Sequence, residues 1–504
     1  MTVIENRFNL VDELWIPIAD VGRVSLKQIF TEPTYRSLGG NPVQKIALTK
    51  LLLAIAQAAY TPQDNDDWQD LGAEGLAEKC LAYLEQWHES FYLYGEKPFL
   101  QMPAIAKAAI QPIGAVLPEI ATGNTTILNA LQIETELNDT DKALLIVQLM
   151  GFGLGGKKTD NTVVLSAGYT GKSNDKGKPS TGKAGASLGF MGFLHNFLQG
   201  ESLLETLWLN LFSQEQVNDL PYGSLGIPPW EKMPEGENCQ IAQDLKNSLM
   251  GRLIPLSRFC LLNDTGLHYS EGINHFDYKT TKIIDPSVAG NFSKDAKVLW
   301  VDTERRPWRY LTSLLSFLGA GGFDCYYLKS GLERLTEVEI DKIGIWSGGL
   351  RVSSNAGEQY VSGSDDFIDS IYFFDKKDLD RHWYTVFDQE MTALDELSKV
   401  VYGATMGYFK SQKAEGKNQA AMASNLFWQL CEHQSQNLIY ICKEKGEEGK
   451  TNRQTLRKTF ANFASTAYNT YCPNDTARQL NAWAENLPNL SKYLKNGKQQ
   501  EAEA

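Results

Sequence analysis

Apolar residues recur at helical spacing in several parts of the chain. Asn41 and Pro42 supply the N-cap and first-turn chemistry of a helix, and the pattern predicts that helix over 43–60. A second amphipathic helix is expected over 71–88, after an acidic loop at 64–67. Further apolar helical segments lie at 203–212 and 307–319.

Shorter runs with β-like patterns lie between these helices. Strands are expected at 9–17 and 249–262, and the aromatic stretch 91–102 is expected to form strand and loop. Segment 24–30 fits a strand or a turn of helix, and 141–150 fits either a helix or a strand. Two β-like runs within 340–370 flank a polar centre, and its Asn and Gly predict a hairpin.

The chain becomes almost entirely helical in pattern after about residue 378. Four segments, 379–412, 419–443, 451–471 and 475–495, are joined by short polar links, which is the pattern of an up-down four-helix bundle. The predicted fold class is therefore α+β. A large mixed α/β domain is expected over 1–375, an all-α four-helix bundle over 376–495, and a disordered tail over 496–504.

Composition narrows the class of protein. The 504 residues are 42% hydrophobic and carry a net charge of −13, so the chain is globular and acidic. Without a local basic patch and partners, that charge argues against nucleic-acid binding. No signal peptide and no 18-residue apolar run are present, so a cytoplasmic protein without a membrane partner is expected. The seven cysteines are scattered, which indicates reduced, buried thiols and no zinc site.

The segment 151–189 stands apart because it is rich in glycine and lysine. Glycine-rich turns form anion-binding nests of backbone N–H groups, and lysines add point charges for phosphate. A solvated, flexible connection has the same composition. Because apolar, helix-like segments flank it on both sides, 190–212 among them, it is an insertion inside a folded domain.

Two nucleotide-binding motifs nearly match the start of this insertion. Gly151, Gly153 and Gly156 fit G-x-G-x-x-G, and Gly151, Gly156 and Lys157 begin a P-loop. Lys158 stands where the P-loop needs a hydroxyl for Mg²⁺. Both motifs also need a strand before them and a helix directly after. A nucleotide-binding enzyme that uses Gly151–Lys157 remains the alternative from the enzyme class.

No other catalytic constellation emerges from the sequence. The six histidines do not fall at ligand spacing, and His268 and His275, seven residues apart, are interpreted as ordinary polar residues. No carboxylates form a defensible acid–base pair. We therefore expect a binding or scaffold protein rather than an enzyme, with no cofactor and no metal.

Several segments, in this order, resemble one family: the large subunit (CasA) of the type I-E CRISPR surveillance complex Cascade. They are NLVDELWIP (9–17), EKPFLQM (96–102), the glycine- and lysine-rich insertion followed by ESLLETLWLNL (201–211), DPSVA (285–289), RRPWRYL (305–311), GIWSGGLR (344–351) and ASNLFWQLCE (423–432). The resemblance covers nearly the whole chain.

The resemblance implies a function. Such a subunit recognises the protospacer-adjacent motif (PAM) in double-stranded DNA from the minor groove and promotes strand separation and R-loop formation. It recruits the helicase–nuclease and is not itself a nuclease. Its partners are crRNA, the other Cascade subunits and the target DNA. Guide pairing and basic neighbours would supply much of the affinity that an acidic chain lacks.

The resemblance also implies site residues. Glycines 153, 155 and 156 would enter the minor groove, with Gly182 or Gly185 as alternatives, and Lys157 and Lys158 would hold phosphates. Lys279 or Lys282 would be a lysine finger that reaches the PAM.

The hairpin tip Ser353, Ser354, Asn355 and Ala356 would insert as a wedge, with Asn355 or Gln359 in place of the family's usual glutamine. Asn124, Ile127 and Asn129 would contact the crRNA and neighbouring subunits, although 122–129 also fits an ordinary surface turn. A purely structural scaffold subunit is a third interpretation.

Overall fold

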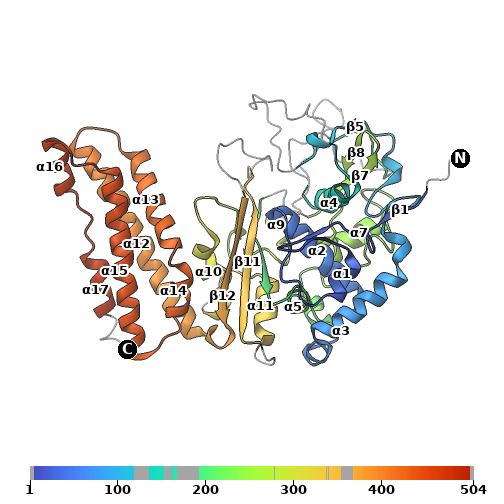
Figure 1. Cartoon of the computed structure of the whole chain (residues 1–504), viewed down its shortest axis with the longest axis horizontal. Coiled ribbons are helices and arrows are strands. Elements are labelled where there is room, and N and C mark those ends of the chain that lie inside the picture. The colour runs from blue at the N-terminus through green and yellow to red at the C-terminus, as the bar shows by residue number, and fades with distance from the viewer. Residues whose placement is uncertain are drawn as a thin grey trace. The chain divides into compact units, whose positions relative to one another are not determined.

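The computed structural model describes residues 5–117, 136–152, 159–160, 163–166, 192–276, 278–319, 321–335, 338, 340–352 and 367–499. The chain divides into two compact units (Figure 1). Unit 1 comprises residues 1–303 and 323–371, and unit 2 comprises residues 304–322 and 372–504. The observed division therefore assigns 304–322, which lies within the expected N-terminal domain, to the C-terminal unit.

Helix α2 (Pro42–Ala59) is the centre of the core of unit 1. It begins as predicted, because the Asn41 side chain accepts the backbone N–H of Gln44 and the Gln44 side chain accepts the N–H of Asn41. Its apolar residues are buried on nearly every side, so it lies inside the unit and not on its surface. One charged side chain, Lys50, is fully buried among them.

Helix α3 (Asn65–Gln86) is interrupted at Gly72, whose φ of 61° and ψ of 178° are not helical. The part after Gly72 corresponds to the helix expected at 71–88, and the part before it is an additional helical segment that the sequence did not predict. The expected acidic loop at 64–67 was wrong, because Asp64 is the N-cap and accepts the backbone N–H of Asp67. Asp66 and Asp67 lie in the first turn, where the helix dipole favours negative charge. The acidic run is therefore a helix start.

The first strands are shorter than the pattern suggested. The expected strand at 9–17 divides into β1 (Arg7–Asn9) and β2 (Ile16–Ile18), with a turn between them. Segment 24–30 resolves into the end of β3 (Gly22–Val24) and helix α1 (Leu26–Thr31). Strand β4 (Tyr92–Tyr94) pairs antiparallel with β1.

Segment 141–150, which the sequence left open, is helix α4 (Asp139–Leu149). The glycine-rich insertion therefore follows a helix, whereas both nucleotide-binding motifs need a preceding strand. Beyond the insertion, segment 190–212 is not helical throughout: strand β6 (His195–Gln199) precedes helix α5 (Leu203–Leu209). Among the described residues, the strand–loop–helix order of a nucleotide site is absent around the insertion.

Two three-stranded sheets lie in unit 1, except that the end of β12, from Tyr372 on, belongs to unit 2. In the first, strand order is β12 (Phe367–Asp375), β11 (Lys342–Leu350) and β6, and Figure 1 shows β11 and β12 as the longest arrows. β11 runs antiparallel to β6, with Ser347 opposite Asn196. β11 confirms the first expected arm, whereas β12 overlaps only the end of the second expected run and continues to Asp375.

The second sheet has the order β5 (Ile110–Gln111), β8 (Gly266–Glu271) and β7 (Arg258–Asn263). The expected strands at 249–262 were correct only in their second half, because Met250–Leu253 forms helix α8. The remaining elements of unit 1 are α6 (Gln214–Asp219), α7 (Gln240–Lys246), α9 (Tyr278–Thr281), β9 (Gly290–Asn291), β10 (Lys297–Val298) and α11 (Tyr326–Arg334).

Unit 2 is helical among its described residues, apart from the end of β12. Its helices are α10 (Leu311–Leu314), α12 (Arg381–Ser411), α13 (Lys417–Glu432), α14 (Ser435–Ile441), α15 (Gly446–Tyr471), α16 (Ala477–Glu485) and α17 (Ser491–Gln499). The structure divides the second and the fourth of the expected helical segments into two helices each. Helices α12, α13 and α15 pack against one another, while the arrangement as a four-helix bundle stays a prediction.

Helix α17 runs to Gln499, so residues 496–499 of the expected tail are helical in backbone, and 500–504 lie outside the described residues. All seven cysteines are free thiols, and six of them are buried, as the sequence indicated. Within the ranges described above, no helix is long and apolar enough to cross a membrane.

Candidate nucleic-acid interface

Two of the predicted site residues, Lys279 and Lys282, belong to the described part of the chain. The others lie outside the described residues: Gly153, Gly155, Gly156, Lys157 and Lys158 of the insertion, with Gly182 and Gly185; Ser353, Ser354, Asn355, Ala356 and Gln359 of the hairpin; and Asn124, Ile127 and Asn129 of the turn. The structure does describe the segments that lead into and out of these loops.

The two lysines lie at one short helical turn, α9, and both side chains are exposed. The backbone N–H of Lys282 donates to the Tyr278 carbonyl at 2.9 Å and so ends the turn. Lys282 takes a left-handed backbone conformation, with φ of 60°, which costs a non-glycine residue about 1 kcal/mol or more. Its Nζ lies 3.4 Å from the Phe292 carbonyl, and Lys279 Nζ lies 5.9 Å from the centroid of the Tyr278 ring.

The end of the insertion meets the base of the hairpin. Gly192, the first described residue after the insertion, has φ of +67°, and a Cβ on it would come within 2.6 Å of the Val352 side chain. Its carbonyl accepts the backbone N–H of Val301 at 2.9 Å. Glycine is required here because the chain turns back against Leu350–Val352, the last described residues before the hairpin tip.

The lysine turn packs against the same segment. Phe193 contacts the Tyr278 ring edge-on, with ring centroids 5.6 Å apart, and also contacts Trp300 at 5.0 Å. Ile284 and Val288 are buried in the same cluster. Residues 192–196 therefore lie between the base of the hairpin and the segment that carries the lysines, and three segments that are distant in sequence meet there.

A buried polar network lies beneath this junction. The Lys50 ammonium on α2 forms an ion pair with Asp285 and donates to the Arg252 carbonyl at 3.0 Å. The other carboxylate oxygen of Asp285 accepts the Ser287 hydroxyl at 2.6 Å and the Ser287 N–H at 3.0 Å. The Ser287 hydroxyl also lies 2.8 Å from Nδ1 of His195, the first residue of β6.

The network continues into the sheet. The Asn196 amide donates to the Ser287 carbonyl at 3.1 Å, and the Ser347 hydroxyl on β11 donates to the Asn196 side-chain oxygen at 2.7 Å. These bonds join α2, the loop 285–289, β6 and β11. The position of the lysine turn relative to the hairpin base is thus fixed by hydrogen bonds that are shielded from water.

Burial controls the charges in this network. Burial lowers the pKa of Lys50 to about 8, although Asp285 opposes the shift. Burial raises the pKa of Asp285, but Lys50 and the other donors outweigh it and leave the pKa below its ordinary value. Burial also lowers the pKa of His195 to about 3, so this imidazole is neutral at pH 7. The pair is charged at pH 7, beside a neutral histidine.

Two fixed points lie inside the insertion. The Asp160 N–H donates to the Tyr269 carbonyl at 2.9 Å, and its carboxylate accepts the Ala109 N–H at 2.8 Å. Farther on, the buried carboxylate of Glu237 accepts the backbone N–H groups of Leu165, at 3.1 Å, and of Ser166, at 2.9 Å. We call these contacts of Glu237 the clasp.

The fixed points divide the insertion into two parts. Phe152, the last described residue before 153–158, is buried and its N–H donates to the Gln148 carbonyl at 3.0 Å. The part 153–158, with Gly153, Gly155, Gly156 and both adjacent lysines, therefore begins and ends at anchored residues. The part that contains Gly182 and Gly185 lies between the clasp and Gly192.

The sequence did not reveal the clasp or the buried pair. Leu165 and Glu237 are 72 residues apart, and no local motif joins them. Lys50 did carry a signal, because it is a charge in a helix that is otherwise apolar on nearly all faces, and such charges need a buried partner. DPSVA (285–289) supplies that partner through Asp285.

The buried histidines have structural roles. The His268 ring lies 2.7 Å from the Ala108 carbonyl, and the His275 ring lies 2.6 Å from the Pro255 carbonyl. Both are therefore ordinary hydrogen-bonded polar residues, as expected. Groups of three or more metal-ligating side chains do not occur in the portion of the chain that the structure describes.

Comparisons with known proteins point to one family. The sequence profile of the family CRISPR-associated protein Cse1 matches residues 9–467. A CRISPR-associated protein CasA/Cse1 from Thermus thermophilus is 28% identical over 335 residues. This match covers 61% of this chain, and it spans only 60% of the relative's own length.

Several solved structures have the same fold as this chain. Thermobifida fusca Cse1 superposes with a TM-score of 0.76 at 19% identity, covering 99% of both chains. Thermus thermophilus CasA (Cse1) gives 0.74 at 18% identity, covering 98% of this chain and all of the other. A chain of a structure described as a CRISPR RNA-guided surveillance complex gives 0.68 at 15% identity, covering 96% of this chain and all of that one.

Proposed function

Because this chain belongs to the CRISPR-associated Cse1 family, we propose that it is the large subunit of a crRNA-guided surveillance complex and reads the PAM in double-stranded DNA. The observation that carries the proposal is the junction at residues 192–196. There the end of the insertion, the lysine turn and the base of the hairpin meet. A reader of duplex DNA needs several loops to act on one short stretch of groove, and this arrangement supports that.

Each element has a role in the proposal. The glycines 153, 155 and 156 enter the minor groove, whose pattern of donors and acceptors is degenerate, and Lys157 and Lys158 hold phosphates. Lys282 is favoured as the finger over Lys279, since of the two it alone holds a strained left-handed backbone conformation. The tip 353–356 acts as a wedge that promotes strand separation and R-loop formation.

The short sequence distance between its anchored ends favours the first part of the insertion as the reader. Both parts begin and end at fixed residues, but 153–158 is much shorter than 167–191, and fewer residues lose conformational entropy when it orders against DNA. Phe152 and Asp160 fix 153–158 in this way. This favours Gly153, Gly155 and Gly156 over Gly182 and Gly185 as the contacting glycines.

The remaining proposals concern partners. Asn124, Ile127 and Asn129 contact the crRNA and neighbouring subunits. The start of α4, just after that segment, is fixed by ion pairs of Arg7 with Asp139 and of Arg23 with Asp141, each at 2.6 Å, which supports a firm base for such a loop. The assembled complex recruits a helicase–nuclease, and this chain performs no catalysis itself.

The test is duplex binding by the reconstituted complex, on targets that differ only in the trinucleotide beside the protospacer. Lys282→Ala should weaken binding to the preferred flank about tenfold, and Lys279→Ala should weaken it less. Lys27→Ala, which removes an exposed lysine of α1, is the matched control and should change nothing. If binding ignores the flank, and all three variants bind alike, the chain is a scaffold subunit.

A further inference from the structure

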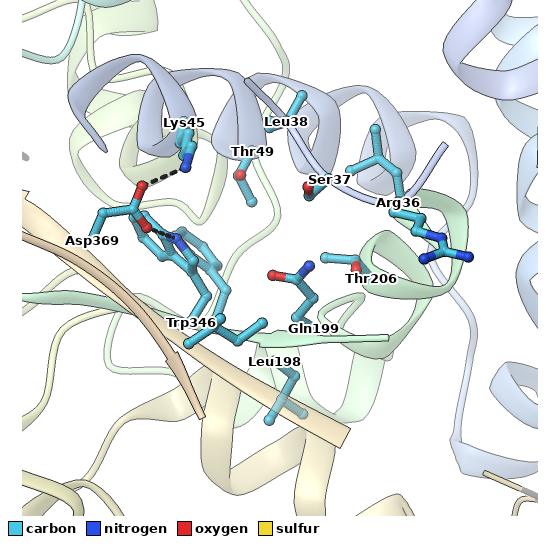
Figure 2. A pocket seen from close by; sticks show the side chains of 13 residues that line it. Arg36, Ser37, Leu38, Lys45, Thr49, Leu198, Gln199, Thr206, Trp346 and Asp369 are labelled. Carbon is cyan, nitrogen blue, oxygen red and sulfur yellow. Dashed lines mark hydrogen bonds and ion pairs between the residues drawn. The ribbon is translucent and has the colours of Figure 1, made fainter. Parts of the chain in front are cut away.

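Unit 1 contains a concave site that the proposed function does not use. A pocket of about 160 Å³ opens between the start of α2, strands β6, β11 and β12, and α5 (Figure 2). Its polar lining consists of Arg36, Ser37, Lys45, Thr49, Gln199, Thr206, Trp346 and Asp369. Neither Lys279, Lys282 nor any described residue of the insertion lines it, and none of the roles above uses it. Because the indole of Trp346 forms one wall, we call this site the indole pocket.

One wall of the indole pocket is a fixed aromatic plane. The Trp346 Nε1–H donates to Asp369 at 2.6 Å, and Asp369 forms an ion pair with Lys45 (Figure 2). The ring lies along its own strand, because a Cβ on Gly348, two residues on, would come within 2.6 Å of it. Phe197, which also lines the pocket, lies opposite Trp346 on the neighbouring strand, with ring centroids 6.1 Å apart. The indole is therefore held in place before any ligand arrives.

The floor of the indole pocket offers hydrogen-bonding groups that are not in use. Within the described residues, neither the Gln199 amide nor the Thr49 hydroxyl has a hydrogen-bond partner. Figure 2 shows both between Trp346 on one side and Arg36 on the other. An amide offers a donor and an acceptor in one plane, which matches the edge of a planar heterocycle.

Charge at the mouth of the indole pocket favours an anion. The Asp369 carboxylate is neutralised by Lys45, which leaves the Arg36 guanidinium as the uncompensated charge of the lining. Arg36 is exposed at the rim and has no partner among the residues described. A guanidinium in this position suits a phosphate that lies outside the pocket while a ring lies inside.

The size of the indole pocket fits a single ring. A cavity of about 150 Å³ holds one benzene molecule, so 160 Å³ accommodates one six-membered ring. We propose that the indole pocket binds one unstacked pyrimidine nucleotide of a single strand, with the base on Trp346, its edge on Gln199 and Thr49, and its phosphate on Arg36. This site is independent of PAM reading.

Photo-crosslinking tests the proposal on the full-length chain. The probes are short single-stranded DNA and RNA oligonucleotides with one central 5-iodouracil, at saturating concentration. The expected product is a crosslink to the peptide that contains Trp346, and UMP and dTMP should compete more strongly than AMP. The DNA and RNA arms show which strand the pocket prefers.

Variants test the individual contacts. Because stacking of a base on an aromatic side chain is worth about tenfold in affinity, Trp346→Leu should weaken binding by about that factor. Gln199→Leu and Arg36→Ala keep the indole in place and should each weaken binding several-fold. Arg381→Ala, which removes an exposed arginine of α12, is the control. Lys282→Ala should leave the crosslink unchanged, and Gln199→Leu should leave the flank dependence of duplex binding unchanged.

Crosslinks confined to other peptides, or equal binding by Gln199→Leu, Arg36→Ala and the native chain, would overturn the proposal. Competition by a glutamate-rich peptide but not by UMP or dTMP would also overturn it, and would assign the pocket to an acidic protein segment instead.

Discussion

Among the described residues, each unit of the molecule contains a buried ion pair, and the two pairs are built differently. In unit 2, Arg457 on α15 meets Glu390 on α12 through two parallel contacts of 2.9 Å, from Nε and Nη2. In unit 1, Lys50 offers Asp285 a single ammonium. Burial opposes the charge of Arg457, but Glu390 outweighs it and raises the pKa of Arg457, whereas the pKa of Lys50 falls to about 8.

The difference shows what each pair does. The fork of Arg457 fits its carboxylate with little further help and joins two helices of one unit. The Lys50 pair needs Ser287 and the Arg252 carbonyl to complete it, and through Ser287 it reaches His195 and the proposed DNA-reading junction. One pair stabilises its own unit, and the other also positions a proposed binding site.

The largest effect is expected from the self-contained pair. Arg457→Met leaves Glu390 buried without a cation, so the free energy of unfolding of unit 2 should fall by about 3–5 kcal/mol. Urea unfolding, with hydrogen exchange of α12 and α15, measures the loss. The control Lys492→Met removes an exposed pair with Glu396 and should cost less than about 1 kcal/mol. Similar losses for both variants would contradict this interpretation.

Breaking the second pair should affect two properties at once. Lys50→Met leaves Asp285 with only Ser287 as donor and should cost about 2–4 kcal/mol of unfolding free energy. Unlike Arg457→Met, Lys50→Met should also weaken flank-dependent duplex binding when it is measured without urea, under conditions where the chain is folded. Adding Asp285→Asn removes the stranded charge and should restore part of the stability. If duplex binding by folded Lys50→Met equals that of the native chain, the network is purely structural.

Acid should destabilise unit 1 through its buried histidines. Burial lowers the pKa values of His195 and His275 to about 3, whereas the unfolded value is about 6.5, so the unfolded chain binds more protons below about pH 6.5. Stability therefore falls as the pH decreases, by about 2 kcal/mol per histidine between about pH 7 and pH 5. Asp285 opposes both shifts, whereas Lys50 adds to the lowering of the pKa of His195, and Arg252 and Lys246 add to the lowering of the pKa of His275.

Urea unfolding at several pH values between neutral and mildly acidic checks the sign and the size of this dependence. His195→Asn and His275→Gln should each make the free energy of unfolding of unit 1 less dependent on pH. His433→Asn, which replaces a histidine of unit 2 that is not fully buried, should leave it unchanged. A stability that rises on acidification would refute the assignment of the two unit 1 histidines as neutral.

The smallest effect is expected at the clasp. Glu237→Gln keeps the shape of the side chain but removes the charge that accepts the N–H groups of Leu165 and Ser166, which should cost about 1–2 kcal/mol. Amide exchange at these two residues should accelerate, and flank-dependent binding should weaken slightly. Glu235→Gln, two residues earlier and exposed, is the control. Unchanged exchange at both amides would mean that the clasp does not fix the insertion.

The sequence predicted most where the signals are local. The cap formed by Asn41 and Gln44, with Pro42, located the start of α2 to within a residue, and the β-like run at the start of 340–370 corresponds to β11. Segment 141–150 was ambiguous because a short apolar run fits a buried helix and a buried strand equally well. The strand expected at 249–262 was half wrong for the same reason.

The site was less predictable than the fold, because its contacts span long sequence distances. The ion pair of Lys50 with Asp285 joins residues 235 apart, and the bond between Ser347 and Asn196 joins residues 151 apart. No spacing rule connects such residues. The family resemblance indicated the loops, whereas the structure identified the residues that hold the segments leading into them.

The division of the chain has a practical consequence for anyone who wishes to produce unit 2 by itself. Residues 304–322 belong to it: Trp308 packs edge-on against Trp428, Arg309 lies 3.7 Å from the centroid of the Trp428 ring, and the Tyr384 hydroxyl donates to the Thr312 carbonyl. A fragment that starts at residue 372 lacks these residues, so Trp428 and Tyr384 lose these contacts. Expressing 372–504 together with residues 304–322 as a tethered peptide keeps them.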